Sequence, residues 1–357
     1  MLRGGPGTRA AVVLSTLLLS GAGLAAVAPA AAQAASASTA AGASVSVLQA
    51  APDVYMLTVD GVNIGVEVGP DGPVVVDTGP ASASQAVVAA IRKLSDKPIR
   101  FVIDTSADAD LVGGNGSVAN AGLSLAMIDP FSAGQTRQLA GRISSPDAGT
   151  GAPIIARQAV LVQLVSQTGA DYSNGGLPSD TFTRPQDTFY VNDGPVEVVS
   201  LPGAHTDGDS AVRFDRADAV VAGAVFDQTR FPVIDLAHGG SVQGEINALN
   251  QLLNTLVFGH TPVLANTGGT VIMPSRGPLS DQDDLVGYRD MVATVSARIQ
   301  YYIAQGKTFQ QIQAADPAQG FHSRYGSDSG SWTTSDFIEA VYKSLMAERK
   351  THHGRQG

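Results

Sequence analysis

The polar residues best suited to chemistry stand in one short segment directly after an apolar run. Ser106, Asp108 and Asp110 follow Ile99–Ile103, and Gly113-Gly114-Asn115 comes next. A zinc site needs clustered carboxylates and imidazoles. Glycines permit the positive φ and the close backbone approach that a tight loop at such a site requires. This segment is therefore the first candidate for a functional site.

The second candidate is a histidine in a turn. His205 lies in Leu201-Pro202-Gly203-Ala204-His205-Thr206-Asp207-Gly208-Asp209, between two predicted strands. An imidazole nitrogen is a preferred zinc ligand. His205 can therefore join Asp108 and Asp110 in one site if the fold brings the two segments together.

The frame of both segments resembles that of the metallo-β-lactamase superfamily. Its members read T-H-x-H-x-D-H-x-G-G-N after a buried strand, and Thr105, Asp110 and Gly113-Gly114-Asn115 fall on that frame without a gap. A G-H-T motif supplies a later ligand in that family, and His205 matches it with one extra residue before the histidine. The resemblance, which covers Val54 to Leu345, implies two zinc ions that activate a bridging water for hydrolysis.

Most of the ligand positions that the resemblance implies hold other residues. The three histidines of the first motif, the bridging aspartate and the last histidine are replaced by Ser106, Asp108, Leu111, Ala224 and Arg276. Leucine has no lone pair to offer, and arginine carries a fixed charge that repels a cation. The bridging subsite is thus lost and no cofactor is expected. One residual zinc site remains open, with Asp108, Asp110 and His205 as ligands.

Arg276 suggests a specific hypothesis. In this hypothesis the guanidinium takes the place of the missing metal charge and pairs with Asp110, and a wider version of the hypothesis adds a pair with Asp108. The reason is that an uncompensated buried charge costs about 3–5 kcal/mol. The opposing interpretation points Arg276 to solvent. A rival alignment puts the last ligand at His260. We favour Arg276, because the last motif is expected to follow a strand and Thr267–Ile272 supplies that strand directly before Arg276.

The resemblance implies a pocket lined by Ser106, Asp108, Leu111, Ala224, Arg276 and Asp77. Asp77, in Val76-Asp77-Thr78-Gly79, ends a core strand beside the metal loop in that family, and it can also cap the next helix. Ser106, His205 and Asp108 can be drawn as a nucleophile triad. No G-x-S-x-G elbow accompanies them, and no phosphate-loop lysine is present.

Two β-rich halves, each followed by helices, position these segments. The first half predicts strands at Val54–Val59, Val62–Val68, Val74–Val76 and Ile99–Ile103, helices at Ser82–Leu94 and Ile154–Gln167, and a surface loop at Asp171–Ser179. The second predicts strands at Phe189–Val191, Val196–Leu201, Ala211–Phe214 and Ala219–Ala222, and helices at Ser241–Leu256, Asp284–Ile303 and Asp336–Met346, with a short helix capped by Thr308 and Gln311 between the last two. The order resembles an α/β fold, the four-layer αβ/βα sandwich of the metallo-β-lactamase fold, with mixed and largely antiparallel sheets.

The N-terminus has the three parts of a secretory signal. Arg3 and Arg9 precede the apolar Ala10–Val27, and Ala32-Gln33-Ala34 gives a cleavage pattern. We therefore predict a signal peptide at 1–34 and a disordered leader at 35–50. The metallo-β-lactamase-like domain follows at 51–347, with a C-terminal helical extension, and a flexible tail occupies 348–357.

Composition restricts the classes of partner. The net charge is −10, and removal of Arg3 and Arg9 makes it more negative, which argues against nucleic acid and against anionic membranes. There are 0 cysteines, so neither a disulfide nor a cysteine nucleophile is available. The partner expected at the cleft is a small molecule or a protein.

These observations favour a secreted or periplasmic, cell-envelope protein with a hydrolase-like fold and a degraded zinc site. It acts through its retained cleft and without catalysis. The alternative is an active mononuclear metal-dependent hydrolase of an ester, lactone or amide, in which Asp110 is the candidate catalytic residue beside Asp108 and His205. At least three convergent ligands and an open water position would distinguish the enzyme, whereas Arg276 and Leu111 filling that space would distinguish the non-catalytic protein.

Overall fold

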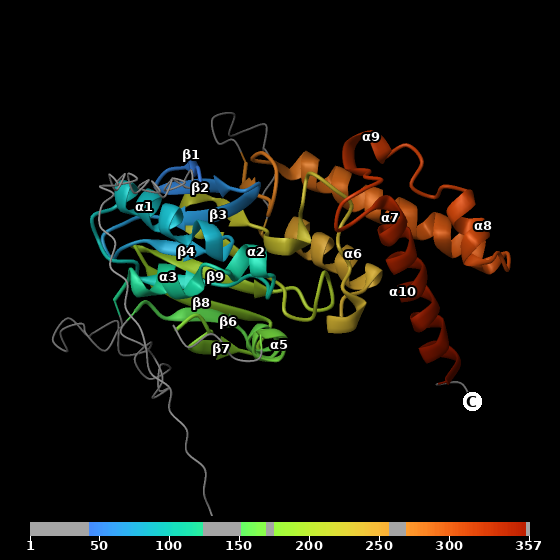
Figure 1. Ribbon diagram of the computed structural model, residues 1–357, viewed down its shortest axis with the longest axis horizontal. Helices are drawn as coiled ribbons and strands as arrows, with labels where there is room; N and C mark the ends of the chain where they lie inside the picture. Colours follow the sequence, from blue (N-terminus) through green and yellow to red (C-terminus); the bar gives the residue numbers. More distant parts are fainter. Residues whose placement is uncertain (1–42, 124–150, 169–174, 257–268, 355–357) are drawn as a thin grey trace, which may run out of the picture. The chain divides into compact units, whose positions relative to one another are not determined.

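The computed structural model describes residues 43–123, 151–168, 175–256 and 269–354, all of which belong to one unit of the chain (Figure 1). The predicted signal peptide, much of the predicted leader and His260 lie outside the described residues. Within the described ranges, no helix is both long and apolar enough to cross a membrane.

The first sheet follows the chain in simple order. Its strands are β1 Ser46–Ala51, β2 Val54–Val59, β3 Val62–Glu67, β4 Val74–Val76, β5 Phe101–Ile103, β6 Ile154–Arg157 and β7 Asp180–Phe182, each paired with the next. The meander β1 to β4 is antiparallel because tight turns join its strands, such as the left-handed pair Asp60 and Gly61. From β4 to β7 the pairing is parallel.

The second sheet is mostly antiparallel. In spatial order it contains β12 Val271–Met273, β11 Ala219–Val221, β10 Ser210–Phe214, β9 Gly194–Ser200 and β8 Gln186–Val191. Only the pair of β11 and β12 is parallel among these strands. The predicted mixed, largely antiparallel sheets are confirmed.

Three apolar clusters lie between four layers of secondary structure. One cluster fills the space between the two sheets, where Phe101 of β5 meets Phe189 of β8 with ring centroids 5.0 Å apart. A second lies between the outer face of the first sheet and the helices α1 Ser84–Leu94 and α3 Asn115–Asn120. The third packs α6 Val242–Gln251, α7 Gln282–Ala304 and α10 Thr334–Gly354 against the second sheet. The predicted αβ/βα sandwich is thus the observed architecture.

The C-terminal helices are capped as their sequences indicate. Asp281 caps α7 by accepting from the backbone N–H of Asp284, and Thr308 with Gln311 forms the predicted capping box of α8 Phe309–Ala314. A short helix α9, His322–Tyr325, precedes α10. Side chains of these helices belong to the apolar cluster that lies against the second sheet.

Three of the differences from the predicted boundaries change the type of structure. Ile154–Gln167 is not one helix: Ile154–Arg157 is the buried strand β6, and only then does α5, Gln158–Thr168, begin. The predicted leader at 35–50 is wrong at its end, because Ser46–Ala51 hydrogen-bonds to β2 as an edge strand. The predicted flexible tail at 348–357 is wrong at its start, because the helical backbone of α10 continues to Gly354.

Candidate functional site

The loop after β5 is anchored from below by Asp77. Asp77 is 1% exposed, and its carboxylate accepts from the backbone N–H of Thr105 at 2.9 Å and from Thr105 Oγ1 at 2.8 Å. Burial raises the pKa of Asp77 to about 7, although the two bonds from Thr105 act in the opposite direction. Asp77 thus holds the loop in place. It does not cap the next helix, which has no side-chain cap, and it does not line the cavity above.

Gly113 and Gly114 serve close approach rather than unusual torsion angles. Their φ values are −62° and −83°, so the predicted need for positive φ is wrong at both positions. A Cβ on Gly114 would lie 2.7 Å from the carbonyl oxygen of Thr78, and one on Gly113 would lie 2.8 Å from the backbone nitrogen of Ala81. The loop therefore packs directly on the end of β4, between α2 Ala109–Val112 and α3.

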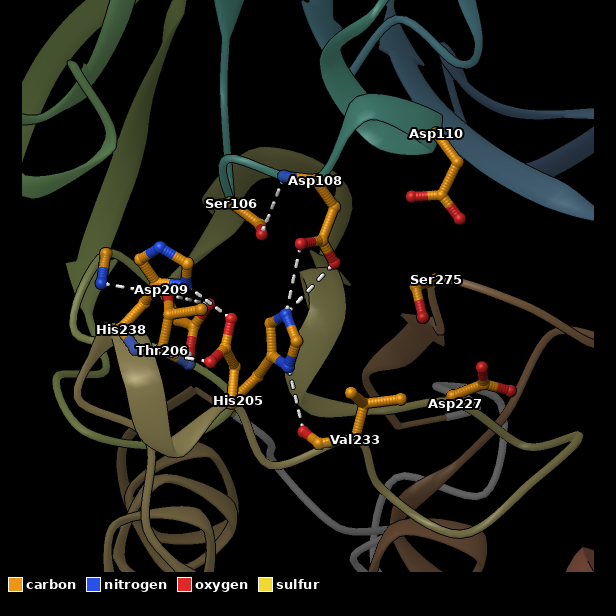
Figure 2. Close-up of polar contacts among 12 residues, drawn as sticks. Ser106, Asp108, Asp110, His205, Thr206, Asp209, Asp227, Val233, His238 and Ser275 are labelled. Atoms are coloured by element: carbon orange, nitrogen blue, oxygen red, sulfur yellow. Dashed lines mark hydrogen bonds and ion pairs between the residues drawn. The ribbon is translucent and has the colours of Figure 1, made fainter. Parts of the chain in front are cut away.

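His205 uses both of its ring nitrogens on protein acceptors (Figure 2). Nδ1 lies 2.8 Å from the carbonyl oxygen of Val233, and Nε2 lies 3.0 Å and 3.1 Å from the two carboxylate oxygens of Asp108. Because a carbonyl and a carboxylate only accept, both nitrogens must carry a proton. Burial alone would lower the pKa of His205, but the hydrogen bond and the charge of Asp108 outweigh it and raise the pKa to about 10.

The pair is therefore an imidazolium facing a carboxylate. Burial of Asp108 raises its pKa, but the hydrogen bond and charge of His205, with the charges of Arg230 and Arg276, leave the pKa below its ordinary value. Asp209 holds the His205 turn by accepting from the backbone N–H of Thr206 at 2.6 Å. Burial raises the pKa of Asp209 to about 7, against the charge of His205.

A second set of charges lies opposite His205. Arg276 Nη2 donates to Asp110 Oδ2, and Arg276 Nε lies 3.6 Å from Asp227. Asp227 is 4% exposed, and it also accepts from Arg230 Nε at 2.8 Å. The segments of Asp227 and Arg276 are adjacent because a parallel backbone bridge joins them next to β12. The predicted pairing of Arg276 with Asp110 is confirmed. Asp108 is not among the hydrogen-bond partners of Arg276 in the described part of the chain.

These two sets of charges enclose a cavity of about 20 Å³, which is room for one water-sized group. Its lining residues are Asp108, Asp110, Leu111, His205, Ala224, Asp227, Arg230, Val233, Ser275 and Arg276. Of the predicted pocket residues, Ser106 is fully buried below the cavity. Its Oγ accepts from the backbone N–H of Asp108 at 3.3 Å, and its described hydrogen bonds do not include His205, so the predicted triad is not assembled.

The residues present do not fit a zinc centre. Leu111 and Ala224 line the cavity without a lone pair, and Arg276 brings a positive charge to Asp110. His205 has no nitrogen lone pair free, since each ring nitrogen faces an acceptor. Within the described part of the chain, no group of three or more His, Cys, Asp or Glu side chains is arranged to hold a metal ion.

Four lining residues were not predicted from the sequence: Val233, Ser275, Asp227 and Arg230. Asp227 and Arg230 stand three residues apart, a spacing common in ordinary turns, so their types alone carry no signal. Asp227 follows Ala224 by three residues. This closeness of Asp227 to the position of the bridging aspartate is the sequence feature that could have indicated its place in the site.

A larger groove opens from the same residues. Its volume is about 470 Å³, and it shares Asp108, His205, Arg230 and Val233 with the small cavity. Its walls are the segment Val233–Leu236 on one side and α10 with Trp332 on the other. The C-terminal helices therefore complete a ligand-sized space over the charged residues of the small cavity. We call these residues the charge cluster: Asp108, Asp110, His205, Asp227, Arg230 and Arg276.

Neither a protein-family model nor a curated protein matches the sequence. The structure is similar to a metallo-β-lactamase from Pontibacter korlensis, with 16% identity, a TM-score of 0.50, and 70% of this chain and 99% of that chain covered. It is also similar to the stereoselective inverting sec-alkylsulfatase Pisa1 from Pseudomonas sp., with 14% identity, a TM-score of 0.56, and 84% of this chain covered.

A double mutant of the same sulfatase gives 15% identity, a TM-score of 0.58 and 85% coverage of this chain. This chain spans only 50% of either sulfatase chain. These similarities, together with the two mixed sheets and the helices outside them, lead to one conclusion. The protein has the metallo-β-lactamase fold.

Proposed function

We propose that this protein is an exported, metal-independent protein of metallo-β-lactamase fold that binds a ligand in its groove and catalyses no hydrolysis. One observation carries the proposal: Arg276, which stands where the family resemblance implies a ligand histidine, bonds to Asp110. Three cations, Arg276, Arg230 and protonated His205, then face three carboxylates. The charge that two metal ions supply in hydrolases of this fold is supplied here by side chains.

The chemistry of the cluster supports this proposal over a mononuclear hydrolase. Metal binding by His205 would have to displace its proton from Asp108, and metal binding by Asp110 would have to displace Arg276. Nothing in the cluster supplies an activated nucleophile, because Ser106 has no hydrogen bond to His205 among its described contacts. The N-terminal signal pattern supports export.

The direct test is metal content and metal response. We expect protein purified without chelator to hold no stoichiometric zinc, and zinc added in excess to leave the melting temperature unchanged, since a ligand that binds only the folded state must raise it. The Asp108→Ala, His205→Ala double variant should give the same metal content as the unaltered protein. His322→Ala, which changes an exposed histidine of α9, is the matched control for loss of an imidazole.

One tightly held zinc per chain that is lost in the double variant, and kept in His322→Ala, would overturn the proposal. That result would support the mononuclear hydrolase with Asp108, Asp110 and His205 as ligands. A screen of esters, lactones and amides would then follow.

A further inference from the structure

The groove above the charge cluster has an apolar middle and a charged floor. Val233, Ile234 and Leu236 form one wall, and Trp332 and Ala340 form the other. Leu236 is 38% exposed, so its side chain is available to a molecule in the groove. At the floor lie Asp108, His205 and Arg230. The groove thus offers apolar walls to the body of a molecule and charge to one of its ends.

Every carboxylate of the groove already has a partner. Asp108 pairs with His205, and Glu339 accepts from Lys343 at 2.7 Å. Asp235 accepts from the backbone and ring of His238, and Asp336 accepts from Thr333. Acceptors that are satisfied in this way have little to gain from a cationic ligand.

Two donors of the groove have no such partner. Arg230 uses Nε on Asp227, and its terminal nitrogens donate to no group in the described part of the chain. The side chain of Arg230 is 32% exposed. Trp332 Nε1 is buried and likewise has no acceptor among the described residues. A ligand oxygen in the groove can satisfy the exposed edge of Arg230, whereas it does not reach the buried Nε1 of Trp332, so Arg230 is the donor that a ligand would use.

We propose that the groove binds an organic carboxylate with an apolar body, and that the free edge of the Arg230 guanidinium is its anchor. A guanidinium presents parallel N–H groups that match a carboxylate in a bidentate pair. The apolar body lies between Leu236 and Trp332. The volume of about 470 Å³ suits a small organic molecule and exceeds that of a simple inorganic anion. This inference rests on the proposed ligand-binding function.

The chain itself contains a reporter for the test. Trp332 is the only tryptophan, so its fluorescence, excited at the red edge of the tryptophan band, reports on the groove. We would titrate the full-length protein with 4-phenylbutyrate, with the neutral 4-phenylbutanol and with the cationic 4-phenylbutylamine. The acid should bind about tenfold more tightly than the alcohol, as a charge-assisted hydrogen-bond pair predicts, and the amine more weakly than either.

Two variants separate the two halves of the groove. Arg230→Gln should abolish the preference for the acid over the alcohol, while Arg230→Lys, which keeps the charge and loses the fork, should retain part of it. Leu236→Ala should weaken binding of acid and alcohol alike. Arg216→Gln, at an exposed arginine that pairs with Asp53, is the matched control and should change nothing. Melting curves of each variant show that it is folded.

Equal affinities for acid and alcohol, preference for the amine, or no binding of any probe would each overturn the inference. So would an unchanged acid preference in folded Arg230→Gln or Arg230→Lys. These outcomes differ from failure of the proposed function, which appears as stoichiometric zinc in the metal measurement. Acid binding that disappears when a chelator removes that zinc would reject both, and acid binding by the metal-free protein supports both.

Discussion

At the scale of single residues, the carboxylates of the site are balanced by cationic side chains. Asp110 and Asp227 lie at one side of the small cavity, where carboxylates without a cation would repel each other and resist burial. Arg276 bonds to the first and lies close to the second, which is also held by Arg230. An arginine in this place therefore stabilises acids that a metal ion would otherwise have to stabilise.

The stability of the cluster depends on Arg276. Its side chain is 19% exposed and that of Asp110 is 42% exposed, so the pair lies between a buried and a surface ion pair. We expect Arg276→Ala to lower the free energy of unfolding by about 1–3 kcal/mol in urea denaturation. Arg216→Ala, at an exposed pair, should cost less than about 1 kcal/mol. Combining Arg276→Ala with Asp110→Ala should recover part of the loss, and strict additivity of the two changes would contradict the pairing.

The ion pair of His205 and Asp108 predicts a pH dependence. The pKa of His205 is raised from 6.5 to about 10. A folded pKa above the unfolded value gives stability that is complete below pH 6.5 and is lost as the pH rises toward about 10. Unfolding measured across that window should show a steeper decline for the unaltered protein than for His205→Gln. Equal slopes would contradict an imidazolium at this position. Asp77 and Asp209, whose pKa values burial raises to about 7, lose stability as the pH rises from 3.8 to about 7, so the two windows overlap at their edge and the difference between the unaltered protein and His205→Gln isolates the histidine.

At the scale of elements, the loop after β5 depends on the carboxyl group beneath it. Asp77 adopts a left-handed conformation with φ 60° and accepts both donors of Thr105. We expect Asp77→Ala to lower the free energy of unfolding by about 2–4 kcal/mol, because two buried donors lose their acceptors. Asp77→Asn keeps an acceptor and tolerates the same backbone, so it should cost less than half as much. Asp53→Asn, at another left-handed but exposed aspartate, is the control. Equal losses in Asp77→Ala and Asp77→Asn would contradict the anchoring role.

The elements were predictable wherever a regular apolar pattern was bounded by turn residues such as glycine, proline or aspartate. The strands Val54–Val59 and Val74–Val76 lie where predicted, since a turn residue bounds each of them. Ile154–Arg157 was not separable from α5, because a short buried apolar run reads as either strand or helix and no glycine or proline marks the junction. The edge strand Ser46–Ala51 has mostly exposed side chains, and only its pairing with β2 identifies it.

The part of the site that lies within the two sequence motifs was predictable, whereas the residues that other segments contribute were not. The positions of Asp110, His205 and Arg276 followed from the motif spacing, and the structure brings all three to one cavity. The part played by Asp227 and Arg230 depends on a backbone bridge between distant segments. Residue spacing within one segment does not predict such a contact between segments, so the place of Asp227 and Arg230 in the site could not be predicted from the sequence.

At the scale of the whole molecule, the fold rests on apolar clusters that are separate from the charged site. Its apolar clusters lie between the sheets and under the outer helices, and the charge cluster lies at the ends of the strands. Burial of these clusters dominates stability, so the site can change its chemistry without loss of the fold. The backbone of the loop after β5 is held by contacts of Asp77, Gly113 and Gly114 that do not involve the side chains lining the cavity.

This separation of scaffold from site predicts that zinc binding can be restored. The substitutions return the ligands that the family resemblance implies: Ser106→His, Asp108→His, Leu111→His, Ala224→Asp and Arg276→His. We expect the fivefold variant to bind about two zinc ions per chain and to melt at a higher temperature when zinc is added, because the metal binds only the folded state. The same variant with His205→Gln should lose one of the two ions, which makes it the matched control. A folded variant that takes up no zinc would show instead that the backbone around Arg276 and Ala224 has moved away from ligand geometry, and that the loss of the metal has become fixed in the fold itself.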